Sequence, residues 1–188
     1  MQENCLLRID NISKHFDCHV ALHDVSCEFF AGENVLLLGA NGAGKSTFLR
    51  ACSGLMRPSS GAIKYQNRDI YQAYSPFCSY FGHDTMLYDA LTLSENLELF
   101  GGVDNITKDQ LFERADFWAL SKYLTQRVST FSKGVGVRSA LLRAFIADKD
   151  LLLLDEPSSS LDEVALTILD AQIAHWREKH PSGIAIIA

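Results

Sequence analysis

The chain has 188 residues, which is enough for one domain with a small insertion. Hydrophobic residues make up 47% of the sequence and the formal net charge is −6, which is typical of a globular protein. Because lysine and arginine form no basic run, the composition argues against a nucleic-acid partner. The apolar runs are far shorter than the roughly 20 residues that span a bilayer, and the N-terminus lacks the pattern of a secretory signal.

The first third of the chain predicts strands that lead into a helix. The segments LLRIDNI (6–12) and VSCEFF (25–30) have the composition of strands. ENVLLLG (33–39) is a continuous apolar run, which is expected of a central strand covered on both faces. A helix is predicted from Lys45 to Leu55, because a glycine and a proline end the pattern.

The rest of the chain alternates predicted strands and helices. Short strands are expected at 61–65 and 77–82. Thr92 to Leu124 contains two segments with helical apolar spacing, LSENLELF and DQLFERADFWAL, and predicts a small helical insertion. The last third predicts a helix (Val135–Ala147), a strand (151–155), a helix (Asp162–Lys179) and a strand (183–188). This order indicates an α/β fold with a mostly parallel sheet.

Residues 39–46, GANGAGKS, match the phosphate-binding spacing G-x-x-x-x-G-K-[ST]. Glycines let the backbone turn tightly, so that successive N–H groups and the positive end of the next helix meet the phosphates. Lys45 would add a charge at the β- and γ-phosphates, and the Ser46 hydroxyl could join a Mg²⁺ shell. A chance glycine turn is the alternative, which the flanking strand and helix disfavour. The predicted nucleotide-binding residues are Gly39, Asn41, Gly42, Ala43, Gly44, Lys45, Ser46 and Thr47.

Two acids end the apolar run LLLLDEP, residues 151–157. Ligands of open α/β sheets bind at the carboxyl ends of the strands, so both carboxylates are candidates for the same site. Asp155 is expected to hold Mg²⁺, directly or through water, and Glu156 to polarise an attacking water. Solvent-facing turn residues are the alternative, and the phosphate-binding loop makes it the weaker one.

These motifs, in this order, resemble the nucleotide-binding domain of ATP-binding cassette (ABC) transporters over nearly the whole chain. The resemblance implies a P-loop NTPase core with a mostly parallel sheet, an N-terminal antiparallel β portion and a small helical insertion. It implies one ABC ATPase domain over 1–188, with a nucleotide-binding core at 1–91 and 135–188 and a helical subdomain at about 92–134. In the family a histidine follows the last strand almost at once, so we expect a truncated C-terminal part and weak hydrolysis.

The resemblance assigns roles at the nucleotide and at the dimer seam. Phe16, in SKHFDCHVAL, stands where the family stacks an aromatic ring on adenine, and a core phenylalanine is the alternative. FSKGV (131–135) stands at the family's LSGGQ signature, which contacts the ATP of a second subunit. Ser132 and Gly134 match that signature, whereas its third and fifth residues are changed to lysine and valine. Asp162, at the end of SSSLD, would lie at the dimer seam.

His83 departs from the family, which has a glutamine there that contacts Mg²⁺ and the lytic water. We expect His83 to be the nucleotide-sensing residue, since a neutral imidazole can accept such contacts; a loop histidine without a role is the alternative. The segment from Gly82 to Leu97 resembles the branch that contains the ATPase of the haem exporter of cytochrome c maturation and ABC-2-type exporters.

The resemblance implies an ATP-binding subunit that hydrolyses MgATP as a dimer and drives export. Its expected partners are a separate integral membrane permease and a second ATPase subunit, identical or paralogous, at the cytoplasmic face of the inner or plasma membrane. The helical insertion is the expected docking surface, although a core position is the alternative for most of its aromatic candidates: Tyr88, Phe100, Phe117 and Trp118. A soluble ABC ATPase that acts on ribosomes or nucleic acid, and an ATP-binding regulatory module, are the competing functions.

Overall fold

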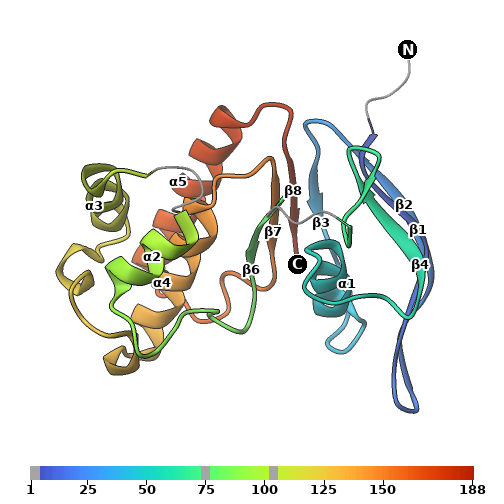
Figure 1. The fold of residues 1–188 in the computed structure, drawn as a ribbon, viewed down its shortest axis with the longest axis horizontal. Helices are drawn as coiled ribbons and strands as arrows, with labels where there is room; N and C mark the ends of the chain where they lie inside the picture. The colour runs from blue at the N-terminus through green and yellow to red at the C-terminus, as the bar shows by residue number, and fades with distance from the viewer. Residues whose placement is uncertain (1–4, 73–76, 102–105) are drawn as a thin grey trace. The chain divides into compact units, whose positions relative to one another are not determined.

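A computed structural model describes residues 5–72, 77–101 and 106–188 (Figure 1). The chain divides into two compact units. The first contains the N-terminal part up to Tyr80 together with Lys149–Asp155 and His180–Ala188. The second contains Phe81–Asp148 and Glu156–Lys179.

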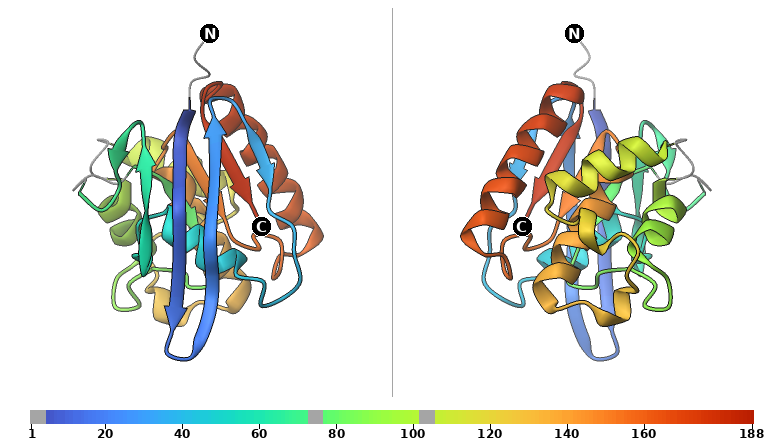
Figure 2. Two further views of the ribbon diagram at one scale, coloured as in Figure 1. Left: turned by 90° about the vertical axis from the view of Figure 1, so that its right-hand side faces the viewer. Right: turned by 90° about the vertical axis from the view of Figure 1, so that its left-hand side faces the viewer.

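The first unit contains an antiparallel sheet with the strand order β2-β1-β4-β5 (Figure 2). Its long strands alternate apolar and polar residues, so that one face is buried and the other meets solvent. The expected N-terminal antiparallel portion is therefore confirmed. The strands are β1 (Cys5–Phe16), β2 (His19–Phe30), β4 (Ser60–Tyr65) and β5 (Arg68–Asp69).

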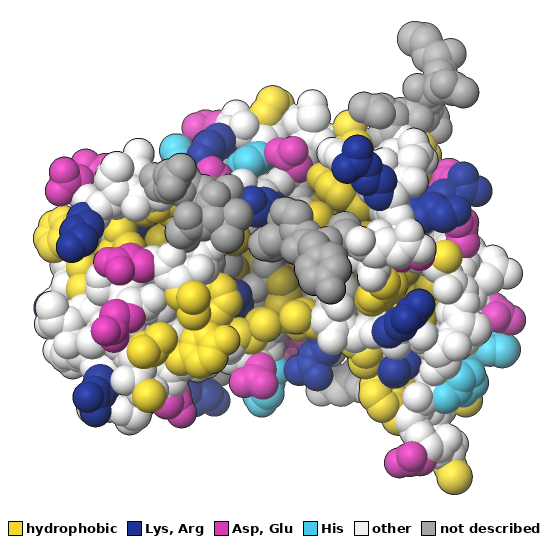
Figure 3. Space-filling view, in the orientation of Figure 1, with side chains coloured by type: hydrophobic (Ala, Val, Ile, Leu, Met, Phe, Trp, Pro, Cys, Tyr) yellow, Lys and Arg dark blue, Asp and Glu magenta, His cyan; other side chains and the backbone are white. Residues whose placement is uncertain are grey.

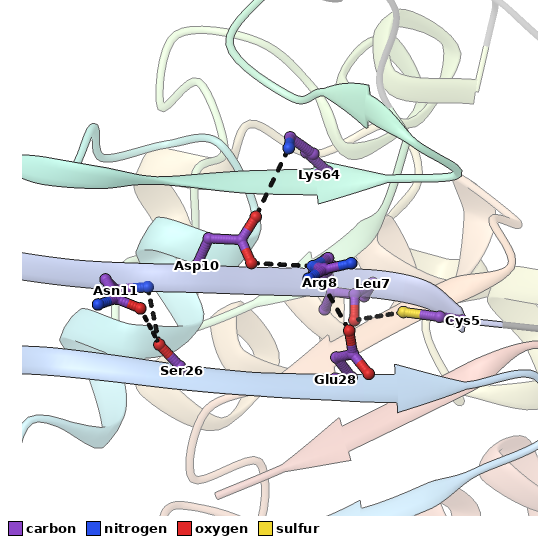
Figure 4. A network of polar contacts seen from close by, with 8 residues as sticks. All are labelled: Cys5, Leu7, Arg8, Asp10, Asn11, Ser26, Glu28 and Lys64. Atoms are coloured by element: carbon purple, nitrogen blue, oxygen red, sulfur yellow. Dashed lines mark hydrogen bonds and ion pairs between the residues drawn. The ribbon is translucent and has the colours of Figure 1, made fainter.

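The solvent face of this sheet carries a network of opposite charges (Figure 4). Arg8 Nε lies 2.9 Å from Asp10 Oδ1 and 3.4 Å from Glu28 Oε1, and Lys64 Nζ lies 3.5 Å from Asp10 Oδ2. The hydrogen bond from Arg8 lowers the pKa of the Asp10 carboxyl. Exposed pairs of this kind contribute little to stability, so this face is a solvated surface.

The first unit also contributes to a second sheet, with the order β3-β8-β7-β6. β3 runs parallel to β8, and β8 runs parallel to β7. All four leucines of β7 are buried, as expected for a strand with neighbours on both sides. The strands are β3 (Asn34–Leu36), β6 (Ser79–Phe81), β7 (Leu151–Leu154) and β8 (Ile184–Ile187).

β3 corrects one expectation. The sequence predicted a central, covered strand, but β3 pairs only with β8 among the described residues and ends the sheet. Leu36 and Leu38 keep 64% and 79% of their surface exposed. The strand itself is confirmed, and its central position is wrong because an apolar run cannot report how many neighbours a strand has.

The second unit is helical, with α4 packed against α2, α3 and α5. Trp118 is fully buried, with its ring centroid 6.1 Å from that of Phe145. The helices are α2 (Leu93–Gly101), α3 (Lys108–Phe117), α4 (Lys133–Ile146) and α5 (Glu163–Lys179), with 3₁₀ turns at Ser121–Tyr123 and Val128–Thr130.

The four aromatic candidates for the docking surface differ in exposure. Tyr88 and Phe117 are 56% and 48% exposed, and Phe100 is half-buried. The prediction that Trp118 lies at the surface is wrong, and the alternative, a core position, is correct. Within the described ranges, none of the helices combines the length and the apolar character needed to cross a membrane.

Candidate functional site

The predicted phosphate-binding loop connects β3 to α1, which spans Lys45–Cys52. Gly42 and Gly44 have positive φ angles of 81° and 91°, a region that favours glycine. Gly44 is the N-cap of α1, and no side chain caps this helix. The N–H groups of its first turn therefore remain available for an anion.

Gly44 also packs tightly against β2. A Cβ atom at this position would lie 2.5 Å from the Ala21 carbonyl oxygen and 3.2 Å from Leu22 Cδ2. A Cβ atom at Gly42 would have no neighbour within 4 Å. Gly42 is therefore needed for its backbone angle alone, whereas Gly44 is needed for its angle and for contact with β2.

The Lys45 side chain folds back over the loop. Its Nζ donates hydrogen bonds to the carbonyl oxygens of Gly39, at 2.8 Å, and Ala40, at 3.2 Å. These bonds place a positive charge at the mouth of the loop. They are exchangeable, because an anion held by the loop is a stronger partner for an ammonium group than a neutral carbonyl.

Ser46 and Asp155 join the two predicted motifs. The Ser46 hydroxyl donates to Asp155 Oδ1 at 3.0 Å, although the residues are 109 positions apart. Asp155 directly follows β7 and is only 4% exposed. A hydroxyl and a carboxylate side by side are oxygen ligands of the kind that Mg²⁺ prefers.

This pair fits a metal that takes few ligands from the protein. In the ranges that the structure covers, no group of three or more His, Cys, Asp or Glu residues could hold a metal ion. Mg²⁺ is commonly held by one or two protein groups, with phosphate oxygens and water completing the octahedron. Ser46 and Asp155 fit this requirement, and they lie beside the loop for which the sequence predicts phosphate binding.

Glu156 belongs to the second unit and has an unusual backbone. Its φ angle is 48°, and its carbonyl accepts a hydrogen bond from Ser159 N at 3.1 Å. The side chain is exposed. A left-handed conformation at a residue other than glycine stores on the order of 1 kcal/mol of strain and is common at functional sites.

The signature segment forms the start of α4. Ser132 is the N-cap, and its Oγ accepts a hydrogen bond from Val135 N at 3.4 Å. Lys133 is exposed at the first helical position, and a Cβ atom at Gly134 would meet nothing within 4 Å. Val135 is buried in the second unit at 6% exposure, so the residue that replaces the family's glutamine serves the core.

The remaining candidates lie in different settings. Phe16 is 46% exposed at the end of β1, with Lys14 Nζ 5.2 Å from its ring centroid, so its core alternative is wrong. His83 is exposed after β6. The Asp162 side chain accepts a hydrogen bond from Ala165 N at 2.8 Å and so caps the start of α5, a role that the sequence did not reveal.

The structure thus brings together the phosphate-binding loop and Asp155 within the first unit. The roles expected of these residues stay predictions, and so do those expected in the second unit. These are catalysis by His83 and Glu156, and contact with nucleotide or the dimer seam by Ser132, Gly134 and Asp162. Sequence reasoning gave no role to Asn96, which is fully buried. The available signal was an amide side chain on the apolar side of a predicted helix.

Comparison with known proteins decides the family. The sequence model described as ABC transporter matches residues 22–159, well over half of the chain. The chain belongs to the ABC transporter family. The expected P-loop NTPase fold and the assignment as an ATP-binding cassette of this family are therefore confirmed.

The chain covers a different share of each relative's length. The chain is 37% identical over 150 residues to the ABC transporter ATP-binding protein NatA of Bacillus subtilis, covering 76% of this chain and 61% of that protein. It is 30% identical over 185 residues to the cytochrome c biogenesis ATP-binding export protein CcmA of Wolbachia pipientis, covering 97% and 88%. A solved structure of an ATP-binding subunit of an ABC transporter is 29% identical, with a TM-score of 0.84, covering 97% of this chain and 79% of that one.

Proposed function

We propose that this ABC cassette binds MgATP, hydrolyses it as a dimer and drives export through a separate integral membrane subunit. The observation that carries the proposal is the hydrogen bond between Ser46 and Asp155. It joins the helix that follows the phosphate-binding loop to the acidic end of β7, 109 residues away. This contact supports a single centre for a nucleotide and its cation.

Each residue has a role that follows from its chemistry. The uncapped first turn of α1 and Lys45 bind the phosphates, and the exposed Phe16 offers a flat face to adenine. Ser46 and Asp155 would hold Mg²⁺, which would neutralise charge on the phosphates when bound. Glu156 orients the attacking water and His83 senses the nucleotide. Positioning and electrostatic stabilisation supply most of the catalysis in phosphoryl transfer.

The dimer and the membrane partner complete the proposal. Ser132 and Gly134 of one subunit meet the ATP of the other, which is an identical or paralogous chain, and Asp162 lies at the seam. The core at 1–91 and 135–188 binds nucleotide, and the helical subdomain at about 92–134 docks a permease at the cytoplasmic face of the membrane. Relatives named as cytochrome c biogenesis export proteins support a role in the same kind of export.

The first test is calorimetric titration of the chain with ATP, with and without Mg²⁺. Asp155→Asn should weaken the Mg²⁺-dependent part of the affinity at least tenfold, because it removes a charged ligand beside the phosphates. Asp150→Asn is the matched control: Asp150 directly precedes the same strand, its side chain is 59% exposed, and it pairs with His180. Failure of the unmodified chain to bind ATP would refute the function.

The second test concerns hydrolysis and the partner. Glu156→Gln should abolish turnover while the affinity for MgATP is kept, since the amide cannot polarise water as a carboxylate does. Gentle purification from native membranes, followed by mass spectrometry, should recover an integral membrane subunit. Recovery of ribosomal proteins instead would replace transport by the competing function.

A further inference from the structure

Asn96 is a fully buried polar residue of the helical unit, and both the oxygen and the nitrogen of its side-chain amide are hydrogen-bonded. It has no exposed surface and lies on α2 between the buried Leu93 and Leu97. Its Oδ1 accepts from Tyr88 N at 2.7 Å, and its Nδ2 donates to Tyr88 O at 3.1 Å and Thr92 O at 2.9 Å. Burying an amide is unfavourable unless it is bonded in this way, so Asn96 holds both backbone groups of Tyr88.

The segment held by Asn96 has a second attachment, to the residues before α4. Ser129 N donates to the Asp89 carbonyl at 3.1 Å, and Val128 N donates to the Leu91 carbonyl at 3.0 Å. These donors belong to the 3₁₀ turn Val128–Thr130, which ends two residues before Ser132. A continuous path of hydrogen bonds therefore connects α2, residues 88–91 and the signature segment.

We call the three hydrogen bonds of the Asn96 side chain, to Tyr88 N, Tyr88 O and Thr92 O, the clamp. The clamp holds the backbone of Tyr88 and leaves its side chain at the surface. The ring is 56% exposed and stacks on Phe100, with centroids 6.3 Å apart. The buried Arg143 places its guanidinium 5.1 Å from the Phe100 centroid. Figure 3 shows hydrophobic side chains gathered on the face that carries α2. A membrane partner that contacts the rings of Tyr88 and Phe100 would therefore act directly on residues 88–91.

We propose that Asn96 is a positioning residue of the ATPase: it fixes residues 88–91, to which the turn before Ser132 is bonded, so that this segment and the turn move as one. The proposal rests on the proposed function. Without Asn96, residues 88–91 are no longer held to α2, and the turn Val128–Thr130, which is bonded to them and precedes Ser132, loses its fixed position as well. ATP binding by a single chain would survive this loss, whereas ATP-driven pairing of two chains, which needs a correctly placed Ser132, would not.

Glu95 provides a matched control beside Asn96. Glu95 Oε2 accepts hydrogen bonds from Thr92 N and Thr92 Oγ1 at 2.7 and 2.8 Å, and so caps α2. Glu95→Ala and Asn96→Ala both remove hydrogen bonds at the start of the same helix. Only Asn96 is bonded to Tyr88, so the pair separates loss of helix stability from loss of the clamp.

The first experiment measures amide hydrogen exchange at single-residue resolution in the full chain. In Asn96→Ala, exchange at Tyr88, Val128 and Ser129 should accelerate together by about tenfold or more, because the buried bonds of the clamp are lost. Glu95→Ala should leave all three amides unchanged. Acceleration at Tyr88 alone would overturn the proposal, because it would mean that the clamp is not connected to the signature segment.

The second experiment measures ATP-driven pairing in the Glu156→Gln background, in which a dimer should persist. Analytical ultracentrifugation should show dimerisation weakened at least tenfold by Asn96→Ala and unchanged by Glu95→Ala, while the MgATP affinity of the single chain stays within twofold. Equal dimerisation in both variants would overturn the proposal. If the chain that carries neither Asn96→Ala nor Glu95→Ala binds no ATP, the proposed function fails. The exchange data would still decide whether the clamp exists.

A measurement on the unmodified chain covers the case in which Asn96→Ala does not fold. ATP should slow exchange at Tyr88, Val128 and Ser129 by the same factor, because the clamp makes them one unit. Slowing at Val128 and Ser129 without any change at Tyr88 would contradict the proposal.

Discussion

Replacing Gly44 by alanine should destabilise the chain far more than the same change at Gly42. Both glycines have positive φ angles, of 91° and 81°. Alanine in the left-handed region loses about 1–2 kcal/mol, and this term applies equally to both positions. The two positions differ only in what surrounds the new methyl group.

The surroundings of Gly44 supply the additional loss. A Cβ atom there would lie 2.5 Å from the Ala21 carbonyl oxygen, closer than real Cβ contacts, and the nearest neighbour is backbone that cannot rotate away. Overpacking of this kind costs about 1–3 kcal/mol, so Gly44→Ala should lose about 2–5 kcal/mol in total. Gly42→Ala, with open space around it, should lose about 1–2 kcal/mol.

Thermal unfolding of the two variants is the assay. At about 2–4 °C per kcal/mol for a chain of this size, the Tm should fall by about 10 °C for Gly44→Ala and by about 4 °C for Gly42→Ala. MgATP titration should show a larger loss of affinity for Gly44→Ala as well, because the loop must move away from β2. Equal Tm values for the two variants would refute the reasoning.

Three further predictions concern the core, the cap of α2 and a buried thiol. Trp118→Ala should lose about 3–5 kcal/mol in urea unfolding, whereas Phe117→Ala, at a 48% exposed side chain, should lose under about 1 kcal/mol; similar losses would contradict this. Hydrogen bonds from the Thr92 backbone and hydroxyl lower the pKa of Glu95, so the cap stabilises α2 above about pH 4.3 and is lost as pH falls through the lowered pKa. The Thr92 amide shift in NMR should titrate below that value, and a midpoint above it would disprove the assignment. Burial raises the pKa of the Cys52 thiol, which should react with iodoacetamide only after unfolding and not in the native chain.

The sequence predicted those features whose chemistry is local. The phosphate-binding loop is eight consecutive residues, so its pattern was complete in the sequence. Helix positions followed from apolar spacing to within a few residues: Lys45–Leu55 was expected and Lys45–Cys52 is observed, and Val135–Ala147 was expected where the structure has Lys133–Ile146. Burial of Trp118 was open, because helical spacing permitted both a surface and a core position.

Features that join distant segments could not be read from the sequence. The contact between Gly44 and the Ala21 carbonyl depends on how β2 packs, and the position of β3 at the end of its sheet depends on strand order. The clamp formed by Asn96 joins a helix to a segment eight residues earlier through backbone groups. Every residue has nearly the same backbone groups, so the sequence does not reveal which of them are bonded. The pairing of Ser46 with Asp155 is the exception, because both side chains belong to motifs that the sequence already assigned to one site.

Glycines of the two predicted nucleotide-contacting segments differ in what the chain itself requires of them. Gly44 is fixed by its backbone angle and by contact with β2. Gly134 and Gly136 lie in the first turn of α4, have no positive φ angle, and would accept a Cβ atom without meeting any atom within 4 Å. Each costs a helix up to about 1 kcal/mol relative to alanine. Neither the backbone angles nor the packing of this chain requires glycine at these two positions. Contact with the proposed second subunit and its ATP would give Gly134, which matches the signature, a role that the single chain does not supply.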